Sequence, residues 1–516
     1  MKAWICVFLG LTMVGLNPVS GESKRAPILD DPFLWLEEIE GARALAWVHD
    51  RNRECFDELE SDARYATFLE QAEALLNAKD RIPYGSVRGR HVYNFWRDAG
   101  HVRGILRRTP LASYRLAKPE WETVLDIDAL AKSEDENWVY KGTTWLAPGY
   151  RRCLVKLSRG GTDASVYREF DAEAKRFVDG GFMLPEGKSG LAWLDRDTLL
   201  VGTDWGDGSL TASGYPRVAK RWKRGTALAK AGTVFEGRKE DIGIWPRVLD
   251  SGEATLPMVD QSLTFFTGAY HLIGDDDQLQ RLPLPESVDV AGFYAGRILF
   301  TLREAWEIAG WTYSQGALLG IDAAAFRATG ELPRIETVYT PDERTSIEGV
   351  AVSRSGLYVT LLQNVKGRLL RFSVDAASGK WSAEPLPLPP NGTVSLSAAN
   401  PHSETVLVNY EDHITPDRLS EYDAGANALT LLKSLPARFR ADDLQVSQHM
   451  AGSADGELVP YFVIHRKGLK PDGSTPTILY GYGGFEISLK PSYSATIGKL
   501  WLERGGAYAV ANIRGG

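Results

Sequence analysis

Hydrophobic positions recur with helical spacing near the N-terminus of this 516-residue chain. Across residues 42–59, apolar side chains return every three or four residues, as they do on one face of an α-helix. A second pattern of this kind covers residues 62–78. Pro83 follows it, and proline cannot continue the hydrogen bonding of a helix. The pattern therefore predicts a helical arm over residues 28–84.

Residues 85–436 show a different pattern, in which short alternating runs are separated by Gly, Asp, Pro and Asn turns. Gly190–Asp195 followed by Thr198–Gly202 is an example, and two such runs around a turn are typical of an antiparallel hairpin. Similar units recur roughly every 45–50 residues, a period that propeller blades share. We distinguish seven units, at 88–117, 138–182, 190–236, 245–285, 292–340, 346–388 and 392–436. The pattern predicts a mainly β fold with a seven-bladed propeller, and two stacked β-sandwiches are the alternative.

The pattern changes again in residues 437–516. A strand pair at 444–450 and 458–465 precedes two apolar, β-prone runs that stop on glycines, at 476–485 and 507–516. A buried strand that delivers a loop to a site has this form. We therefore expect the start of an α/β domain here.

The first residues have the pattern of a secretory signal. Lys2 precedes an apolar run of 14 residues, 3–16, which is too short to span a bilayer in the usual way. Small residues follow up to Gly21, and the chain then becomes polar. The sequence predicts a signal peptide over residues 1–21, with an uncleaved anchor as the alternative. The mature protein is expected to be periplasmic or secreted, without a membrane segment.

Composition excludes several functional classes. The chain is 44% hydrophobic and 24% charged with a net charge of −8, and no basic run points to nucleic-acid binding. Metal-ligand spacings such as His-x-x-x-His and Cys-x-x-Cys do not occur, nor does a P-loop, so we expect no metal and no cofactor. Cys6 lies in the leader, while Cys55 and Cys153 are expected to be buried thiols, although one bridge between them is possible.

Tyr480–Phe485, with the sequence Tyr-Gly-Tyr-Gly-Gly-Phe, carries the strongest sign of chemistry. Its glycines let the backbone approach a ligand closely, and its aromatic residues supply hydroxyl donors and an apolar wall. Aromatic–glycine turns also close ordinary barrels, so spacing alone leaves a structural role open.

Three stretches, Asp31–Glu37, Tyr480–Phe485 and Ala511–Gly516, resemble signatures of the prolyl oligopeptidase family of serine peptidases. The order of arm, β region and α/β segment is similar as well. The resemblance implies a seven-bladed propeller that caps an α/β-hydrolase domain, with the N-terminal arm packed on that domain. It also implies cleavage of short proline-containing peptides by Ser, Asp and His, by a protein that we expect to be a monomer.

Positions in the motif imply roles for individual residues. Tyr482 matches the hydroxyl that stabilises the family's oxyanion, and a phenol held by glycine-fixed backbone suits that task. Phe485 matches an aromatic residue that lines the pocket for the proline ring. We expect Arg514 to be structural or electrostatic and not catalytic.

One departure from the family concerns the nucleophile. A hydrolase of this fold carries it in a Gly-x-Ser-x-Gly elbow, which the printed sequence lacks. None of the eight histidines stands beside such a motif. We therefore expect an incomplete hydrolase domain in an inactive fragment that lacks the catalytic Ser, Asp and His, with on the order of 200 further residues in the whole protein. The alternatives are a non-catalytic propeller that binds peptides and a related oligopeptidase with basic-residue specificity, although Phe485 favours proline.

Overall fold

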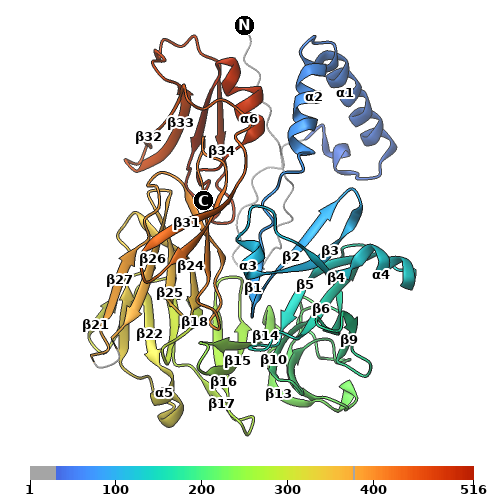
Figure 1. The fold of residues 1–516 in the computed structure, drawn as a ribbon, viewed down its shortest axis with the longest axis vertical. Helices are drawn as coiled ribbons and strands as arrows, with labels where there is room; N and C mark the ends of the chain where they lie inside the picture. Colours follow the sequence, from blue (N-terminus) through green and yellow to red (C-terminus); the bar gives the residue numbers. More distant parts are fainter. Residues whose placement is uncertain (1–30, 376–377, 516) are drawn as a thin grey trace. The chain divides into compact units, whose positions relative to one another are not determined.

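The computed structural model describes residues 31–375 and 378–515 (Figure 1). The expected signal peptide, residues 1–21, lies outside this range. The chain divides into two compact units, residues 1–73 and 74–516. In the part of the chain that the structure describes, no helix is long and apolar enough to cross a membrane.

The first unit is helical. It contains the 3₁₀ turn η1 (Leu34–Glu37), helix α1 (Ala42–Glu60) and most of helix α2 (Tyr65–Leu76). Trp35 of η1 packs edge-on against Trp47 of α1, with ring centroids 6.3 Å apart. Helix α2 begins later than residue 62 because Asp62 holds a turn in which its side chain accepts a hydrogen bond from the Arg64 N–H at 2.9 Å.

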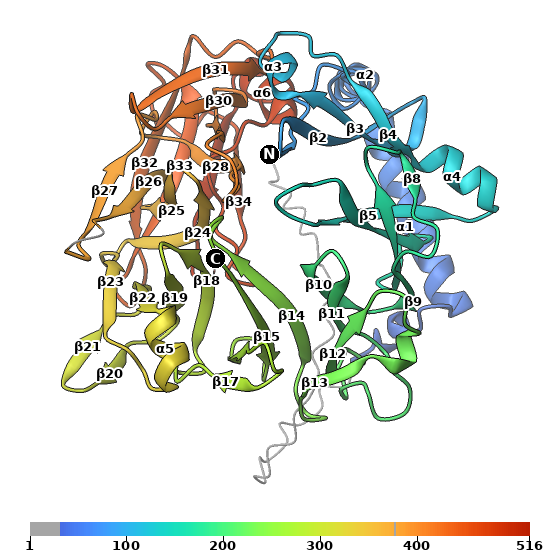
Figure 2. The same ribbon diagram turned by 60° about the horizontal axis from the view of Figure 1, so that its bottom comes forward.

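Seven antiparallel sheets make up most of the second unit, which is mainly β, and Figure 2 shows them following one another around a common centre. The first three sheets are β1 (Ser86–Arg88), β2 (His91–Asp98), β3 (His101–Pro110) and β4 (Glu122–Asp126); β5 (Trp138–Trp145), β6 (Arg152–Arg159), β7 (Ser165–Asp171), β8 (Arg176–Phe177) and β9 (Met183–Gly187); and β10 (Gly190–Asp195), β11 (Thr198–Gly202), β12 (Val218–Lys223) and β13 (Gly232–Glu236). Each consists of strands consecutive in the chain, so every sheet is a local unit.

The remaining sheets repeat this plan. They are β14 (Gly243–Asp250), β15 (Thr255–Ser262), β16 (Gly268–Ile273) and β17 (Leu279–Arg281); β18 (Val288–Tyr294), β19 (Arg297–Leu302), β22 (Leu318–Asp322) and β23 (Ile335–Tyr339); β24 (Thr345–Ser353), β25 (Gly356–Gln363), β26 (Lys366–Val374) and β27 (Trp381–Pro385); and β28 (Thr393–Ala398), β29 (Val406–Glu411), β30 (Arg418–Asp423) and β31 (Ala428–Ser434). The connections hold the two-stranded ribbon β20 (Trp306–Ile308) and β21 (Trp311–Tyr313), the short helices α3 (Leu111–Tyr114), α4 (Ile127–Glu134) and α5 (Ala323–Thr329), and the 3₁₀ turn η2 (Leu228–Lys230).

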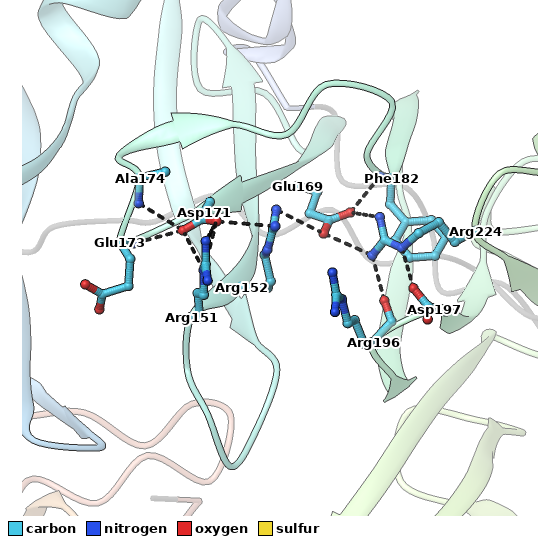
Figure 3. Close-up of polar contacts among 10 residues, drawn as sticks. All are labelled: Arg151, Arg152, Glu169, Asp171, Glu173, Ala174, Phe182, Arg196, Asp197 and Arg224. Carbon is cyan, nitrogen blue, oxygen red and sulfur yellow. Dashed lines mark hydrogen bonds and ion pairs between the residues drawn. The ribbon is translucent and has the colours of Figure 1, made fainter.

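Buried ion pairs join neighbouring sheets, and Figure 3 shows the network between the second and third. The carboxylate of Glu169 on β7 accepts two hydrogen bonds from Arg224 beyond β12, at 2.8 and 3.0 Å. It also accepts one from the backbone N–H of Phe182 at 2.9 Å. Arg224 reaches Asp197 at 2.7 Å, so one guanidinium serves two carboxylates.

The first and seventh sheets share no strand, so side chains alone close the ring between them. Val87 and Val92 of the first sheet and Tyr114 of helix α3 belong to one buried cluster with Leu407 and Leu419 of the seventh sheet. Hydrogen bonds also join the first and seventh sheets at this junction, which we call the seam. The Tyr84 hydroxyl donates to Asn409 at 2.9 Å, and Arg115 donates to Glu421 at 2.6 and 2.8 Å.

A loop of the seventh sheet, residues 399–405, makes contacts well beyond its neighbours in chain order. His402 Nε2 lies 2.7 Å from Asp250 Oδ2 of the fourth sheet. Asn400 accepts a hydrogen bond from the Tyr150 hydroxyl of the second sheet at 2.9 Å and donates to the Val87 carbonyl of the first at 3.0 Å. Arg354 of the sixth sheet donates to the His402 carbonyl at 3.2 Å. This loop therefore links five of the seven sheets.

The chain ends in a mixed sheet with the order β32–β33–β35–β34. Its elements are β32 (Leu444–Gly452), β33 (Leu458–Arg466), β34 (Thr477–Gly481), α6 (Ala495–Leu500), η3 (Leu502–Arg504) and β35 (Ala507–Ala511). Phe462, Ile464 and Val510 form its buried core. Val365 and Ile414 also pack against this core, and they come from the part of the unit formed by the seven antiparallel sheets, which we call the seven-sheet body. The two parts of this unit thus share a core.

The two cysteines in the described residues are free. Cys153 is buried in β6, and burial raises the pKa of its thiol. Cys55 is exposed, so the expectation of a buried thiol is wrong at that position. Ala44 is the only buried residue of α1, so Cys55 shares the exposure of nearly the whole helix.

Candidate active site

Strands β34 and β35 run parallel, and their carboxyl ends bring the two glycine-rich loops together. The register pairs Thr477 with Ala507 and Gly481 with Ala511, so both strands end at the same edge of the sheet. Residues 482–486 follow β34, and residues 512–515 follow β35. Ligand sites of α/β sheets form at the carboxyl ends of parallel strands.

The two loops touch so closely that only glycine fits at the contact. A Cβ on Gly483 would lie 2.5 Å from the carbonyl oxygen of Arg514. A Cβ on Gly515, whose φ is +92°, would lie 2.1 Å from the carbonyl oxygen of Gly483. The Glu486 N–H donates to the Gly515 carbonyl at 3.0 Å. The glycines are therefore a packing requirement of the loop pair.

Phe485 and Glu486 both adopt a left-handed backbone conformation, with φ of +56° at each residue. This region disfavours residues that carry a side chain, so the loop holds them there against local preference. The side chain of Phe485 remains 69% exposed. The loop thus presents an aromatic face to its surroundings instead of burying it.

Tyr482 lies at the base of the same loop and is 40% exposed. A Cβ on Gly484 would come within 2.8 Å of its hydroxyl oxygen, so the second glycine leaves room for the phenol. Its hydroxyl makes no hydrogen bond to any described residue. A positioned, unpaired phenol can donate to an oxyanion that forms beside it.

Arg514 anchors the second loop to the turn between β32 and β33. It forms an ion pair with Asp455 and donates to the Ser453 hydroxyl at 2.8 Å. Hydrogen bonds from Arg514 lower the pKa of Asp455 to about 2. The expected structural role of Arg514 agrees with these contacts.

Asn512 fixes the start of the same loop. Its side-chain amide donates to the Leu489 carbonyl at 2.7 Å, and its backbone N–H donates to the Pro460 carbonyl at 3.0 Å. Its side-chain oxygen is buried and has no partner among the described residues.

The segment after the loop runs onto the seven-sheet body. Lys490 pairs with Glu348 at 2.5 Å, and the Thr393 hydroxyl donates to the Pro491 carbonyl at 2.6 Å. The Tyr493 N–H donates to Glu411 at 2.8 Å, and burial raises the pKa of that carboxyl. The loop is thus held from both the mixed sheet and the body.

Two residues near the loop, Arg303 and Phe266, were not predicted from the sequence as candidate site residues. Arg303, which follows β19, lies 3.8 Å from Glu486 and 5.6 Å from the ring of Phe266. Phe266 and its neighbour Phe265 are both exposed in the turn between β15 and β16. The available signal was an apolar pair inside a polar turn, Thr264–Thr267.

The structure brings no histidine to this loop by any contact among the described residues. His413 is the most enclosed, beneath Phe462 with ring centroids 5.2 Å apart. Burial lowers its pKa to about 4. The described residues also contain no group of three or more His, Cys, Asp or Glu side chains that could hold a metal ion.

Comparison with known proteins identifies the class. Residues 22–252 match the family described as "Prolyl oligopeptidase, N-terminal beta-propeller domain". An uncharacterised peptidase of Sinorhizobium fredii is 40% identical over 98% of this chain and 70% of its own length. A prolyl endopeptidase of Elizabethkingia miricola is 26% identical over 95% of this chain and 66% of its own.

Solved structures agree with these relatives. A post-proline cleaving enzyme from Rickettsia typhi superposes with a TM-score of 0.82 at 28% identity, covering 93% of this chain and 71% of its own. Oligopeptidase B from Leishmania major, at 16% identity and a TM-score of 0.71, shares the fold over 94% of this chain and 67% of its own. The matched family and the shared fold place the chain among peptidases that carry an N-terminal β-propeller domain. The chain belongs to the prolyl oligopeptidase family of serine peptidases, which confirms the resemblance seen in its sequence.

Proposed function

We propose that this chain is the N-terminal part of an exported serine peptidase that cleaves short peptides after proline. The single observation that carries the proposal is the Tyr482 hydroxyl, exposed and unpaired among the described residues, at the end of a parallel strand. In acyl transfer a serine oxygen bonds to the scissile carbonyl carbon, and the carbonyl oxygen becomes an anion. Tyr482 donates a hydrogen bond to that oxygen and stabilises the transition state.

Phe485 gives the proposed specificity. Its exposed ring is a flat apolar wall, and the pyrrolidine ring of proline has no N–H that such a wall would leave unsatisfied. A pocket for arginine or lysine would need a carboxylate instead. The carboxylate of Glu486, the next residue, lies 3.8 Å from Arg303. Proline is therefore favoured over basic residues.

The seven sheets are proposed to be the blades of a seven-bladed propeller, residues 85–436, and the mixed sheet to be the start of the hydrolase domain, residues 437–516. Leu479 on the edge strand β34 is 73% exposed, which suits a sheet that continues with further strands. We place the nucleophilic serine, the acid and the histidine in that continuation. The signal peptide directs the protein to the periplasm or the exterior, where it acts as a monomer.

The test compares the printed chain with the product of the complete reading frame. The longer protein should release p-nitroaniline from a blocked peptide ending in proline p-nitroanilide, and the printed chain should not. Tyr482→Phe in the longer protein should lower kcat by about 10²–10³-fold with a smaller change in KM. Faster hydrolysis of an arginine p-nitroanilide, or activity of the printed chain, would contradict the proposal. Cell fractionation tests the export.

A further inference from the structure

A cavity of about 460 Å³ opens at the seam between the first and seventh sheets. None of its lining residues belongs to the Tyr482 loop or to any part of the mixed sheet. Cationic and aromatic side chains make up one part of its lining: Arg81, Trp96, Arg107, Trp121 and Lys433. The proposed peptidase chemistry gives this cavity no role.

The cationic groups are held by stacking on aromatic rings. The guanidinium carbon of Arg107 lies 4.1 Å from the ring centroid of Trp96 and 4.3 Å from that of Trp121. Arg81 lies 4.3 Å from the same Trp96 ring, and Lys433 lies 4.8 Å from the ring of Tyr114. These contacts with the indole rings restrain the two guanidinium groups before any ligand arrives.

None of these three cations forms an ion pair with a carboxylate among the described residues. Arg81 donates to the Arg97 carbonyl, and Arg107 donates to the Asn94 side-chain oxygen at 2.8 Å. Lys433 donates to two backbone carbonyls, of residues 114 and 116, at 2.8 and 3.0 Å.

Carboxylates stand near the cavity but are engaged elsewhere. Asp80, the acidic residue in its lining, pairs with Arg438. Asp98 is held by His101 at 3.0 Å and by the indole N–H of Trp96 at 3.0 Å. Burial lowers the pKa of Arg107 to about 10, Asp98 opposes this shift, and the charge of Arg81 adds to it. An anion in the cavity would relieve the repulsion between the two guanidinium groups.

The rest of the lining is apolar. Ile82, Pro83, Pro119, Leu432 and Pro436 lie beside the cations. An inorganic anion would leave this wall without a partner. An organic anion with an apolar group next to its charge would contact both halves of the cavity.

We propose that this cavity binds the C-terminal carboxylate of a short peptide whose last residue is apolar. The choice of peptide rests on the proposed function, because cleavage after proline yields a product with a C-terminal proline carboxylate. The carboxylate accepts hydrogen bonds from Arg81, Arg107 and Lys433, and the last side chain packs on the apolar wall. Because the lining comes from both the first and the seventh sheet, the bound product ties the seam together.

Calorimetric titration of the printed chain with N-acetyl-Ala-Pro free acid tests this proposal without requiring hydrolysis. We expect saturable binding that weakens at high salt and a rise in Tm with ligand concentration. The matching amide, N-acetyl-Ala-Pro-NH₂, and inorganic phosphate should each bind at least about tenfold more weakly, because one lacks the charge and the other the apolar group.

Two substitutions locate the site. Arg81→Gln changes an exposed side chain that makes one hydrogen bond within the described part of the chain, to a backbone carbonyl, and Lys433→Met keeps the length of its chain. Each should weaken binding about tenfold or more, since each removes a charged donor. Arg90→Gln, an exposed arginine of the same sheet that does not line the cavity, is the control and should leave binding unchanged.

Equal binding of acid and amide, phosphate that binds as tightly as the peptide, or no binding at all would overturn the proposal. Binding unchanged in both Arg81→Gln and Lys433→Met would overturn it as well. The outcome is independent of the catalytic test: a longer protein that fails to cleave after proline can still bind the free acid here.

Discussion

At the scale of single residues, Glu169 is a carboxylate that is almost fully buried and accepts several hydrogen bonds. Its side chain is 1% exposed, and its carboxylate accepts two bonds from Arg224 and one from the Phe182 N–H. Asp197 pairs with the same Arg224 but is 65% exposed. The two carboxylates therefore share a partner and differ in their access to water.

Glu169→Gln should destabilise the fold by about 2–4 kcal/mol, because it leaves the charge of Arg224 poorly compensated inside the protein. Asp197→Asn should cost less than about 1 kcal/mol, since water screens that pair. Urea unfolding of the three proteins, followed by tryptophan fluorescence, measures both changes. Equal losses for the two variants would show that burial does not set the value of these pairs.

His413 gives a residue-scale prediction about pH. Burial lowers its pKa from the ordinary 6.5 to about 4, while Asp412 acts in the opposite direction. In the unfolded chain the imidazole of His413 therefore takes up a proton near pH 6.5, whereas in the folded protein it does so only near pH 4. Stability should fall as the pH drops through this window, by about 2–3 kcal/mol from this residue.

His413→Gln removes that proton, so the variant should lose less stability than the parent between pH 6.5 and 4. His271, whose pKa burial also lowers to about 4, is present in both proteins and cancels in the difference. Unfolding midpoints measured at several pH values give the comparison. Parallel curves for parent and variant would contradict the assignment.

At the scale of elements, the two glycine-rich loops behave as one unit. Gly483→Ala places a methyl group 2.5 Å from the Arg514 carbonyl, so the loops must separate. We expect the Glu486 amide, which donates to Gly515, to lose protection from hydrogen exchange. Gly452→Ala is the matched control, because its methyl group would meet no atom within 4 Å. Unchanged protection in Gly483→Ala would mean that the loops accommodate the methyl group without separating.

Local pattern was enough to predict many strands. The runs Gly190–Asp195 and Thr198–Gly202 correspond to β10 and β11, which pair as one antiparallel hairpin around a turn, and β11 is buried at all five positions. Helix α5 was not predicted, although Asp322 caps its start and Gly330 its end in the left-handed conformation. Its seven residues are too few for helical periodicity to stand out.

Contacts distant in sequence could not be predicted in this way. The motif made Tyr482 and Phe485 candidates, but the approach of Gly483 to Arg514 depends on the parallel pairing of β34 with β35. Arg303 and Phe266 come from two other sheets, and no spacing in the chain links them to the loop. Pairing across the seam, such as Tyr84 with Asn409, likewise follows only from the closed arrangement of sheets.

At the scale of the whole second unit, the bond between His402 and Asp250 connects sheets that are not neighbours in chain order. We expect a double-mutant cycle of His402→Ala and Asp250→Ala to give a coupling of about 1–2 kcal/mol, because both side chains are mostly buried. The exposed pair Arg281 and Glu286 should couple by less than about 0.5 kcal/mol. Equal coupling in the two cycles would mean that the His402–Asp250 contact stabilises the protein no more than an exposed ion pair does.

The two sides of the seam are made at different times during protein synthesis. Tyr84 and its partner Asn409 are separated by 325 residues, so the ribosome must translate for about 15–65 s between them at typical rates. Throughout that interval Val87, Val92 and Tyr114 lack the apolar surface that covers them in the finished protein. A nascent chain of this kind offers chaperones a binding site of defined place and duration, which ends when the last sheet leaves the ribosome.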